Sequence, residues 1–212
     1  MKISTALKTL LGAAAVTLPI MVHAESNVTT GAGTLTATAH VNFAVVIPKV
    51  LYLRVGTGST YTGTTPSLTS VATIDTVTFS PASGAVGNGT AVAGTGGDLN
   101  NGIETAAIVS NFGSVTLTAT ATGALSDGAG DTIPYTQITT ASSTLTSTTA
   151  LPAPVLSNTT SNSVVLTAPA NKLITEDAKW TFSYLNTVAA PAGTYGATVA
   201  NNGQITYTAT MP

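Results

Sequence analysis

The sequence contains no cysteine, which excludes both a disulfide framework and a thiolate metal site. It is also poor in charge: Asp, Glu, Lys and Arg make up 7% of the 212 residues, far below the roughly 25% of an average soluble domain. The surface must therefore consist mostly of Thr, Ser, Asn, Gly and Ala. Such a surface repels a second copy only weakly, so it tolerates self-association.

The first 24 residues have the features of a signal peptide. Lys2 and Lys8 provide a positive start, residues 9–22 are apolar, and Ala24 ends a small-residue cleavage motif. The apolar stretch is shorter than the roughly 20 residues of a membrane-spanning helix, and no later stretch is apolar for that length. We therefore expect cleavage after Ala24, passage through the periplasm, an extracellular or cell-surface location and no membrane span. Residues 25–212 would form a single domain.

Loss of the leader changes the charge balance. It removes two of the six basic residues and none of the eight acidic ones, which leaves a formal net charge of −4. Nucleic acid is a poor partner for such a chain, because its binding depends on Lys and Arg that neutralise phosphates.

The inventory of catalytic residues is equally short. His40 is the only histidine outside the leader, so a zinc site with two histidine ligands is excluded. A Ser-His-Asp triad would have to use His40. Spacing cannot nominate a carboxylate pair of the kind that glycosidases use. We predict that the protein is not an enzyme.

Residues 34–55 show the clearest period of two. Apolar side chains occupy every second position, and Thr, His or Asn stand between them; the apolar positions begin with Leu35, Ala37, Ala39, Val41 and Phe43. This alternation predicts a strand. Pro48 cannot donate to a ladder, so it divides the stretch into strands at 34–47 and 49–55. From Ala44 onward both parities are apolar, and we expect this end to be covered on both faces.

Further short strand patterns follow, separated by turns rich in Gly, Pro and Asn, and none has helical spacing. Strands are expected at 68–80, 90–93, 103–109, 114–122, 133–139, 143–148, 164–168, 178–185, 193–199 and 204–211. Two hairpins are expected, 103–109 with 114–122 and 193–199 with 204–211. Residues 178–185 place Trp180, Phe182 and Tyr184 on one face. The pattern predicts an all-β antiparallel sandwich or barrel of about ten strands.

Two kinds of ligand fit the loops and the surface. Asp98, Asp127 and Asp131 lie in Gly-rich loops, where carboxylates and carbonyls can bind calcium. Their spacing does not match an EF-hand, and Asp before Gly is also ordinary turn chemistry. Exposed tyrosines could instead form a platform for a glycan. The candidates are Tyr52, Tyr61, Tyr135, Tyr195 and Tyr207.

The C-terminal residues resemble those of a known family. Pro191-Ala192-Gly193-Thr194-Tyr195, Val199 and the final ITYTATMP, together with the alternating stretch after the leader, are similar to secreted bacterial fimbrial-subunit and spore-coat-U-like proteins. The resemblance implies an immunoglobulin-like β-sandwich. In fimbriae it also implies polymerisation by donation of an N-terminal strand to the next subunit. The donated face would be Leu35, Ala37, Ala39, Val41 and Phe43.

The sequence departs from this family in lacking a cysteine pair and in having enough strands to complete its own sandwich. We therefore expect residues 34–47 to form the first strand of the protein's own sheet, with donation to a partner as the alternative. The predicted function is a secreted, non-catalytic structural or cell-surface assembly protein, such as a fimbrial-type subunit, whose partners are its own copies or other subunits. The alternative is an extracellular module that binds carbohydrate or another ligand, with or without stabilising calcium.

Overall fold

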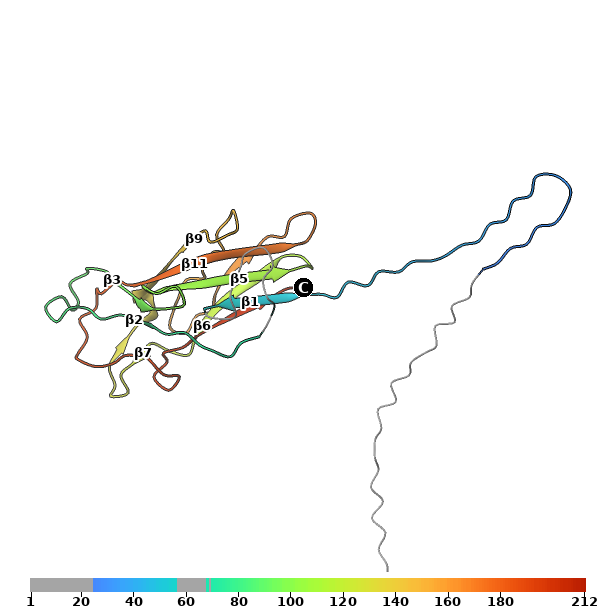
Figure 1. Cartoon of the computed structure of the whole chain (residues 1–212). Coiled ribbons are helices and arrows are strands. Elements are labelled where there is room, and N and C mark those ends of the chain that lie inside the picture. Colours follow the sequence, from blue (N-terminus) through green and yellow to red (C-terminus); the bar gives the residue numbers. More distant parts are fainter. Residues whose placement is uncertain (1–24, 57–67, 69) are drawn as a thin grey trace, which may run out of the picture. The chain divides into compact units, whose positions relative to one another are not determined.

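The computed structural model describes residues 25–56, 68 and 70–212 (Figure 1). The chain divides into two compact units, Met1–Ile47 and Pro48–Pro212. The predicted signal peptide lies outside the described residues. Within them, no helix has both the length and the hydropathy that crossing a bilayer requires.

All twelve strands of the described chain lie in Pro48–Pro212, and every pair of strands is antiparallel. The larger sheet has five strands in the order β1-β5-β11-β3, with β9 also pairing with β11. Its strands are β1 (Leu51–Val55), β3 (Val92–Ala93), β5 (Ile103–Ser110), β9 (Ile138–Ser143) and β11 (Ile174–Tyr184). The protein therefore has the predicted all-β fold.

The second sheet has three strands in the order β10-β6-β12. They are β6 (Val115–Ala121), β10 (Asn162–Leu166) and β12 (Ile205–Thr210). Two short ribbons complete the unit: β2 (Val77–Thr78) pairs with β4 (Thr95–Gly96), and β7 (Leu125–Ser126) pairs with β8 (Thr132–Ile133). A 3₁₀ turn, η1, covers Tyr135–Gln137.

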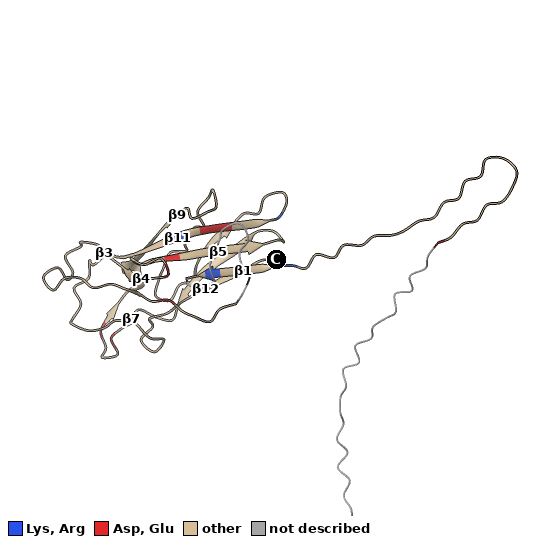
Figure 2. Ribbon diagram, in the orientation of Figure 1, with Lys and Arg blue, Asp and Glu red and all other residues tan. Residues whose placement is uncertain are grey.

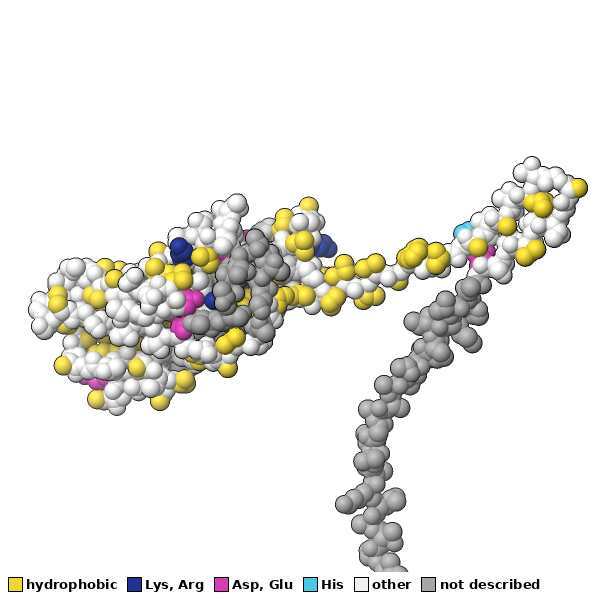
Figure 3. Space-filling model, viewed as in Figure 1, with side chains coloured by type: hydrophobic (Ala, Val, Ile, Leu, Met, Phe, Trp, Pro, Cys, Tyr) yellow, Lys and Arg dark blue, Asp and Glu magenta, His cyan; other side chains and the backbone are white. Residues whose placement is uncertain are grey.

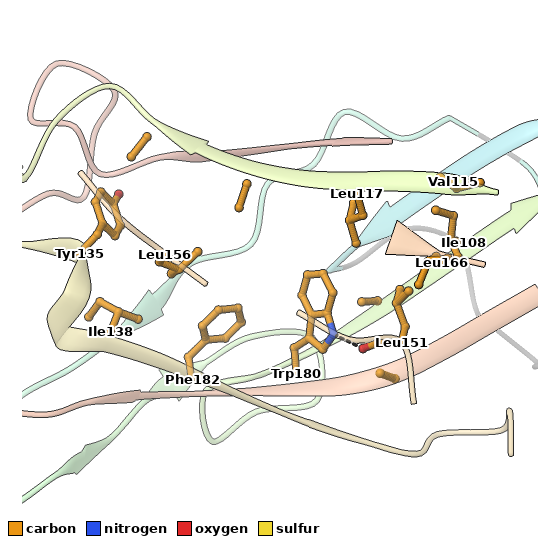
Figure 4. Packing of buried hydrophobic residues seen from close by; sticks show 14 of the residues in the cluster. Ile108, Val115, Leu117, Tyr135, Ile138, Leu151, Leu156, Leu166, Trp180 and Phe182 are labelled. Atoms are coloured by element: carbon orange, nitrogen blue, oxygen red, sulfur yellow. Dashed lines mark hydrogen bonds between the residues drawn. The ribbon is translucent and has the colours of Figure 1, made fainter. Parts of the chain in front are cut away.

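The core lies between the two sheets and is built around Trp180 (Figure 4). The Trp180 side chain is fully buried, its ring lies 5.2 Å from that of Tyr207 on β12, and its Nε1–H donates to the carbonyl oxygen of Leu151 at 2.8 Å. This bond satisfies the one polar atom of the indole, which would otherwise be buried at a cost. Phe182 and Tyr184 are buried on the same strand, so the predicted aromatic row is confirmed.

The alternation of β6 also produces the predicted burial. Val115, Leu117, Ala119 and Ala121 are buried, whereas the threonines between them are only partly covered. The structure thus confirms a strand with one apolar face and one threonine face.

Both predicted hairpins are wrong. Strands β5 and β6 form where the first hairpin was predicted, at residues 103–109 and 114–122. They belong to different sheets, however, and pack against the shared core from opposite sides. The C-terminal strand β12 pairs with β6 and not with residues 193–199. Those residues form no strand, and Gly196 and Ala197 have φ angles of 80° and 66°, which a ladder cannot accommodate.

Two other strand predictions were inaccurate in extent, and one was wrong. Of residues 68–80, only β2 forms a strand among those described. Residues 133–139 are divided between β8 and β9, because Pro134 precedes the η1 turn. The strand predicted at 143–148 is wrong, since β9 ends at Ser143 and the following residues form a loop.

The strand predicted at residues 34–47 is also wrong as part of the protein's own sheets. Residues 25–47 contain no strand, and all of them are exposed. The expected burial of both faces from Ala44 onward is wrong as well, because Val45, Val46 and Ile47 are 86%, 90% and 76% exposed. By contrast, the strand predicted at 49–55 is confirmed as β1.

Candidate functional site

The most unusual surface of the described chain consists of the apolar side chains at the odd-numbered positions of residues 35–47. We call residues 35–47 the N-terminal segment. Leu35 is 47% exposed, Val41 72% and Phe43 88%, and Ala37 and Ala39 are exposed as well. Figure 3 shows apolar side chains in yellow along this unit. Soluble proteins rarely leave so continuous an apolar surface uncovered unless it contacts a partner.

The backbone of the N-terminal segment also has no partner strand in the described part of the chain. No backbone-to-backbone hydrogen bond involves residues 35–47 in the described part of the chain. An extended backbone with unpaired N–H and C=O groups can add to the edge of another sheet. The segment therefore offers both an apolar face and a hydrogen-bonding backbone.

Side-chain contacts fold residues 25–40 back on themselves. Thr29 Oγ1 donates to the Thr36 carbonyl oxygen at 3.1 Å, and the backbone N–H of His40 donates to Glu25 Oε2 at 3.1 Å. His40 Nδ1 lies 2.8 Å from the same carboxylate oxygen. Both residue pairs are symmetric about a bend at residues 31–33, where Gly33 has a φ of 121°. The result is a loose hairpin-like turn without a ladder.

The start of the second unit is held firmly. The Asn111 side chain accepts from the Val50 N–H at 2.8 Å and donates to the Pro48 carbonyl oxygen at 2.8 Å. The Asn111 side chain thus continues the pairing of β1 with β5 beyond Leu51 and Ser110. Pro48 has no N–H to leave unsatisfied, so it suits this position. Pro48, which the sequence predicted only as a break between two strands, is the first residue of the second unit.

The second unit has sheet edges that a further strand could use. Among the described strands, β1 pairs only with β5, and β12 pairs only with β6. These two strands belong to different sheets and are neighbours. Leu53 of β1 and Ile205 and Tyr207 of β12 are partly buried against the core. A strand added here would extend a sheet and cover this apolar margin.

The predicted calcium ligands are not brought together. Asp127 Oδ1 accepts the backbone N–H groups of Ala129, Gly130 and Asp131 at 2.8, 3.1 and 3.0 Å, so this carboxylate organises its own turn. Asp98 instead accepts from the Thr105 N–H at 2.8 Å and from Arg54 Nη2 at 3.4 Å. Within residues 25–56, 68 and 70–212, no three His, Cys, Asp or Glu side chains are arranged to hold a metal.

Sequence reasoning missed a cluster of buried charge around Gly56. Glu104 is 5% exposed and hydrogen-bonds Asp75, and its Oε2 accepts the Asp98 N–H at 3.2 Å. Burial, followed by the neighbouring charges of Asp75 and Asp98, raises the pKa of Glu104 from 4.5 to about 7. Gly56 is required beside this cluster, because a Cβ there would lie 2.5 Å from Asp75 Oδ2 and its φ is +80°. The only signal in the sequence was that Asp75 interrupts an apolar parity.

The tyrosines do not form the predicted platform. Tyr135 is buried, its hydroxyl donates to the Asn202 carbonyl oxygen at 2.7 Å, and burial raises its pKa to about 12. Tyr207 packs against Trp180. Tyr52 and Tyr195 are half-buried on separate elements, and Tyr61 lies outside the described residues. Nor does His40 contact a serine hydroxyl within the described chain, where its ring bonds Glu25.

Comparison with protein-family models, curated proteins and solved structures gives no match. The functional argument therefore depends on the residues themselves.

Proposed function

We propose that the protein is a secreted, non-catalytic structural subunit that assembles at the cell surface, in the manner of a fimbrial subunit. The observation that supports this best is the N-terminal segment, whose apolar parity is exposed and whose backbone lacks a ladder partner. The leader-like residues 1–24 support the proposed secretion, and the low charge supports close packing of copies.

In this proposal the N-terminal segment of one copy adds as a strand to an open edge, β1 or β12, of the next. Each large apolar side chain that becomes buried contributes about 1.5–3 kcal/mol. Val41, Phe43 and Ile47 share one parity and would enter the partner together. Because the donor and the acceptor are different surfaces, the contact is heterologous and continues as a filament unless it closes into a ring.

A pair of neighbouring substitutions tests the proposal in the chain that lacks residues 1–24. Phe43→Asp places a negative charge on the apolar face of the segment, and Asn42→Asp places the same charge on its polar face. We expect filaments or large oligomers of the unsubstituted chain in electron microscopy and light scattering. Phe43→Asp should remain monomeric with an unchanged melting temperature, whereas Asn42→Asp should still assemble.

A peptide of residues 34–47 provides an independent check, since it should compete for the acceptor edge and shorten the assemblies. The proposal fails if the unsubstituted chain is monomeric at every concentration tested. It also fails if Phe43→Asp and Asn42→Asp assemble equally well.

A further inference from the structure

The exposed charges of Pro48–Pro212 are segregated by sign at two ends of the unit. Among its described residues, the charged residues of the exposed class are Lys49, Lys172 and Asp131, and the others are half-buried or buried. The two lysines flank Phe112, and we call these three residues the lysine end. Asp131 lies with Asp127 in the β7–β8 turn, residues 127–131, which we call the aspartate turn. In a chain with so few charges, this separation gives the unit an electric dipole.

The lysine end is well defined. Lys49 Nζ lies 3.3 Å from the centre of the Phe112 ring and donates to the Pro212 carbonyl oxygen at 3.2 Å. Lys172 Nζ lies 5.9 Å from the centre of the same ring. The backbone of Lys172 is fixed as well, because its N–H donates to Pro169 at 2.8 Å. Neither lysine forms an ion pair in the part of the chain that the structure describes.

The aspartate turn is equally fixed. Its shape is set by the three backbone N–H groups that Asp127 accepts. Asp131 donates its own N–H to this carboxylate, but its side chain is exposed and forms no ion pair among the described residues. The turn therefore presents two negative charges on a backbone that is already ordered.

Strand register places the two groups at opposite ends. The lysine end adjoins the residues where β1 and β11 begin and β5 ends, since Leu51 and Ile174 both pair with Ser110. The aspartate turn adjoins the other end of β6, where Ala121 pairs with Ile205 and the Ser126 N–H donates to Asn201. In Figure 2 the red residues beside β7 lie away from the start of β1.

The remaining charges do not blur this pattern. Arg54 and Asp98 form an ion pair whose side chains are 9% and 7% exposed, and Glu104 lies in the same cluster. Asp177 is buried and accepts the backbone N–H groups of Thr146 and Ser147 at 2.8 and 2.9 Å. These charges are satisfied by partners inside the unit. The half-exposed Glu176 and Lys179, three residues apart on β11, have opposite signs and add no net charge.

We propose that the lysine end of one copy binds the aspartate turn of a second copy. The partner is this same chain because each end is complementary to the other and repels its own kind. Contacts between like ends are thereby disfavoured, and the copies align head to tail. This inference takes self-assembly from the proposed function but adds a second contact, which does not involve the N-terminal segment.

The expected strength is modest and depends on salt. An exposed ion pair contributes about 0.2–1 kcal/mol, so each pair strengthens association by up to about fivefold. Added salt screens such pairs, with a Debye length of about 10 Å at 0.1 M. The contact would therefore affect the orientation of the copies and their association rate more than their binding affinity.

A charge-swap cycle tests the proposal in the chain without residues 1–24. Lys172→Glu and Asp131→Lys should each weaken association at low ionic strength by about two- to fivefold in analytical ultracentrifugation. The double variant should recover the original association, because the two ends are again complementary. Lys179→Glu, which changes net charge equally but lies on β11 away from either end, should have no effect. Circular dichroism verifies that each variant is folded.

The proposal is overturned if the double variant associates as weakly as the two single variants combined, or if Lys179→Glu acts like Lys172→Glu. Phe43→Asp separates this contact from strand donation. If Phe43→Asp abolishes assembly while the charge variants change nothing, donation stands and the end-to-end contact fails. If the charge cycle behaves as expected and Phe43→Asp has no effect, the opposite holds.

Discussion

Residues 35–41 (LTATAHV) and strand β6 (VTLTATA) have nearly the same alternating sequence but opposite surroundings. In β6 the strands β10 and β12 pair on both sides, and Val115 and Leu117 are fully buried. In the N-terminal segment the backbone has no ladder, and Val41 is 72% exposed. An alternating pattern makes a segment able to form a strand, whereas the availability of a partner edge decides whether the strand forms.

The largest expected effect sharpens this contrast by truncating one apolar side chain in each region. Leu117→Ala should lower the free energy of unfolding by about 2–5 kcal/mol, because it removes buried methyl groups and leaves a cavity. Val41→Ala, the matched change in the exposed segment, should stay within about 0.5 kcal/mol. Urea denaturation of both variants under monomeric conditions measures the difference. Equal losses would mean that residues 35–47 are packed after all.

The next effect arises only in the folded unit and comes from Glu104. Its raised pKa means that the folded state binds an extra proton between pH 4.5 and about 7. The contribution of Glu104 to stability should therefore be fully present below pH 4.5 and should be lost as pH rises toward 7, a change of up to about 3 kcal/mol. Glu104→Gln should flatten this dependence in melting curves. An unchanged pH profile would contradict the assignment.

A smaller effect concerns the boundary between the two regions. Asn111→Ala removes the partners of the Val50 N–H and the Pro48 carbonyl, which should cost about 1–2 kcal/mol. Amide hydrogen exchange at Val50 should accelerate, while exchange in the middle of β11 should not. Asn171→Ala, in the neighbouring β10–β11 loop, serves as a control. If exchange at Val50 is the same in all three proteins, Asn111 does not anchor the start of β1.

The smallest effect tests the fold-back of residues 25–40. Glu25→Gln should weaken its contact with His40, which as an exposed pair contributes at most about 1 kcal/mol. Nuclear Overhauser contacts between Thr29 and Thr36 should weaken in the variant, and the melting temperature should not change. Undiminished contacts would show that the bend at residues 31–33 alone sustains the turn.

Sequence predicted those features that depend on residues close together in the chain. The period of two identified β6, β11 and β12, and the spacing of Trp180, Phe182 and Tyr184 identified their shared buried face. The break predicted at Pro48 is consistent with β1, which begins after it, because a missing N–H constrains only its own position.

Features that depend on distant partners could not be predicted in this way. The hairpins were wrong because β6 pairs with β10 and β12, whose sequences lie far downstream. The cluster of Asp75, Asp98 and Glu104 was missed because the fold, and no local motif, brings these carboxylates together. Residues 34–47 have the period of a strand but form none, since an alternating sequence contains no information on which edge will receive it.

The pairing of β12 with β6 also determines the order of events during synthesis. Ile205 pairs with Ala121, and Thr210 pairs with Thr116, so the smaller sheet cannot close until residues 205–210 have been made. Sheets with such distant pairings fold in milliseconds to seconds, which is slow for a domain of this size. Residues 35–47 are made early, whereas β12, one of the two proposed acceptor edges, is made much later. In the proposed assembly, a copy can therefore accept a strand at β12 only after residues 205–210 have paired with β6, even though its own donor segment was made much earlier.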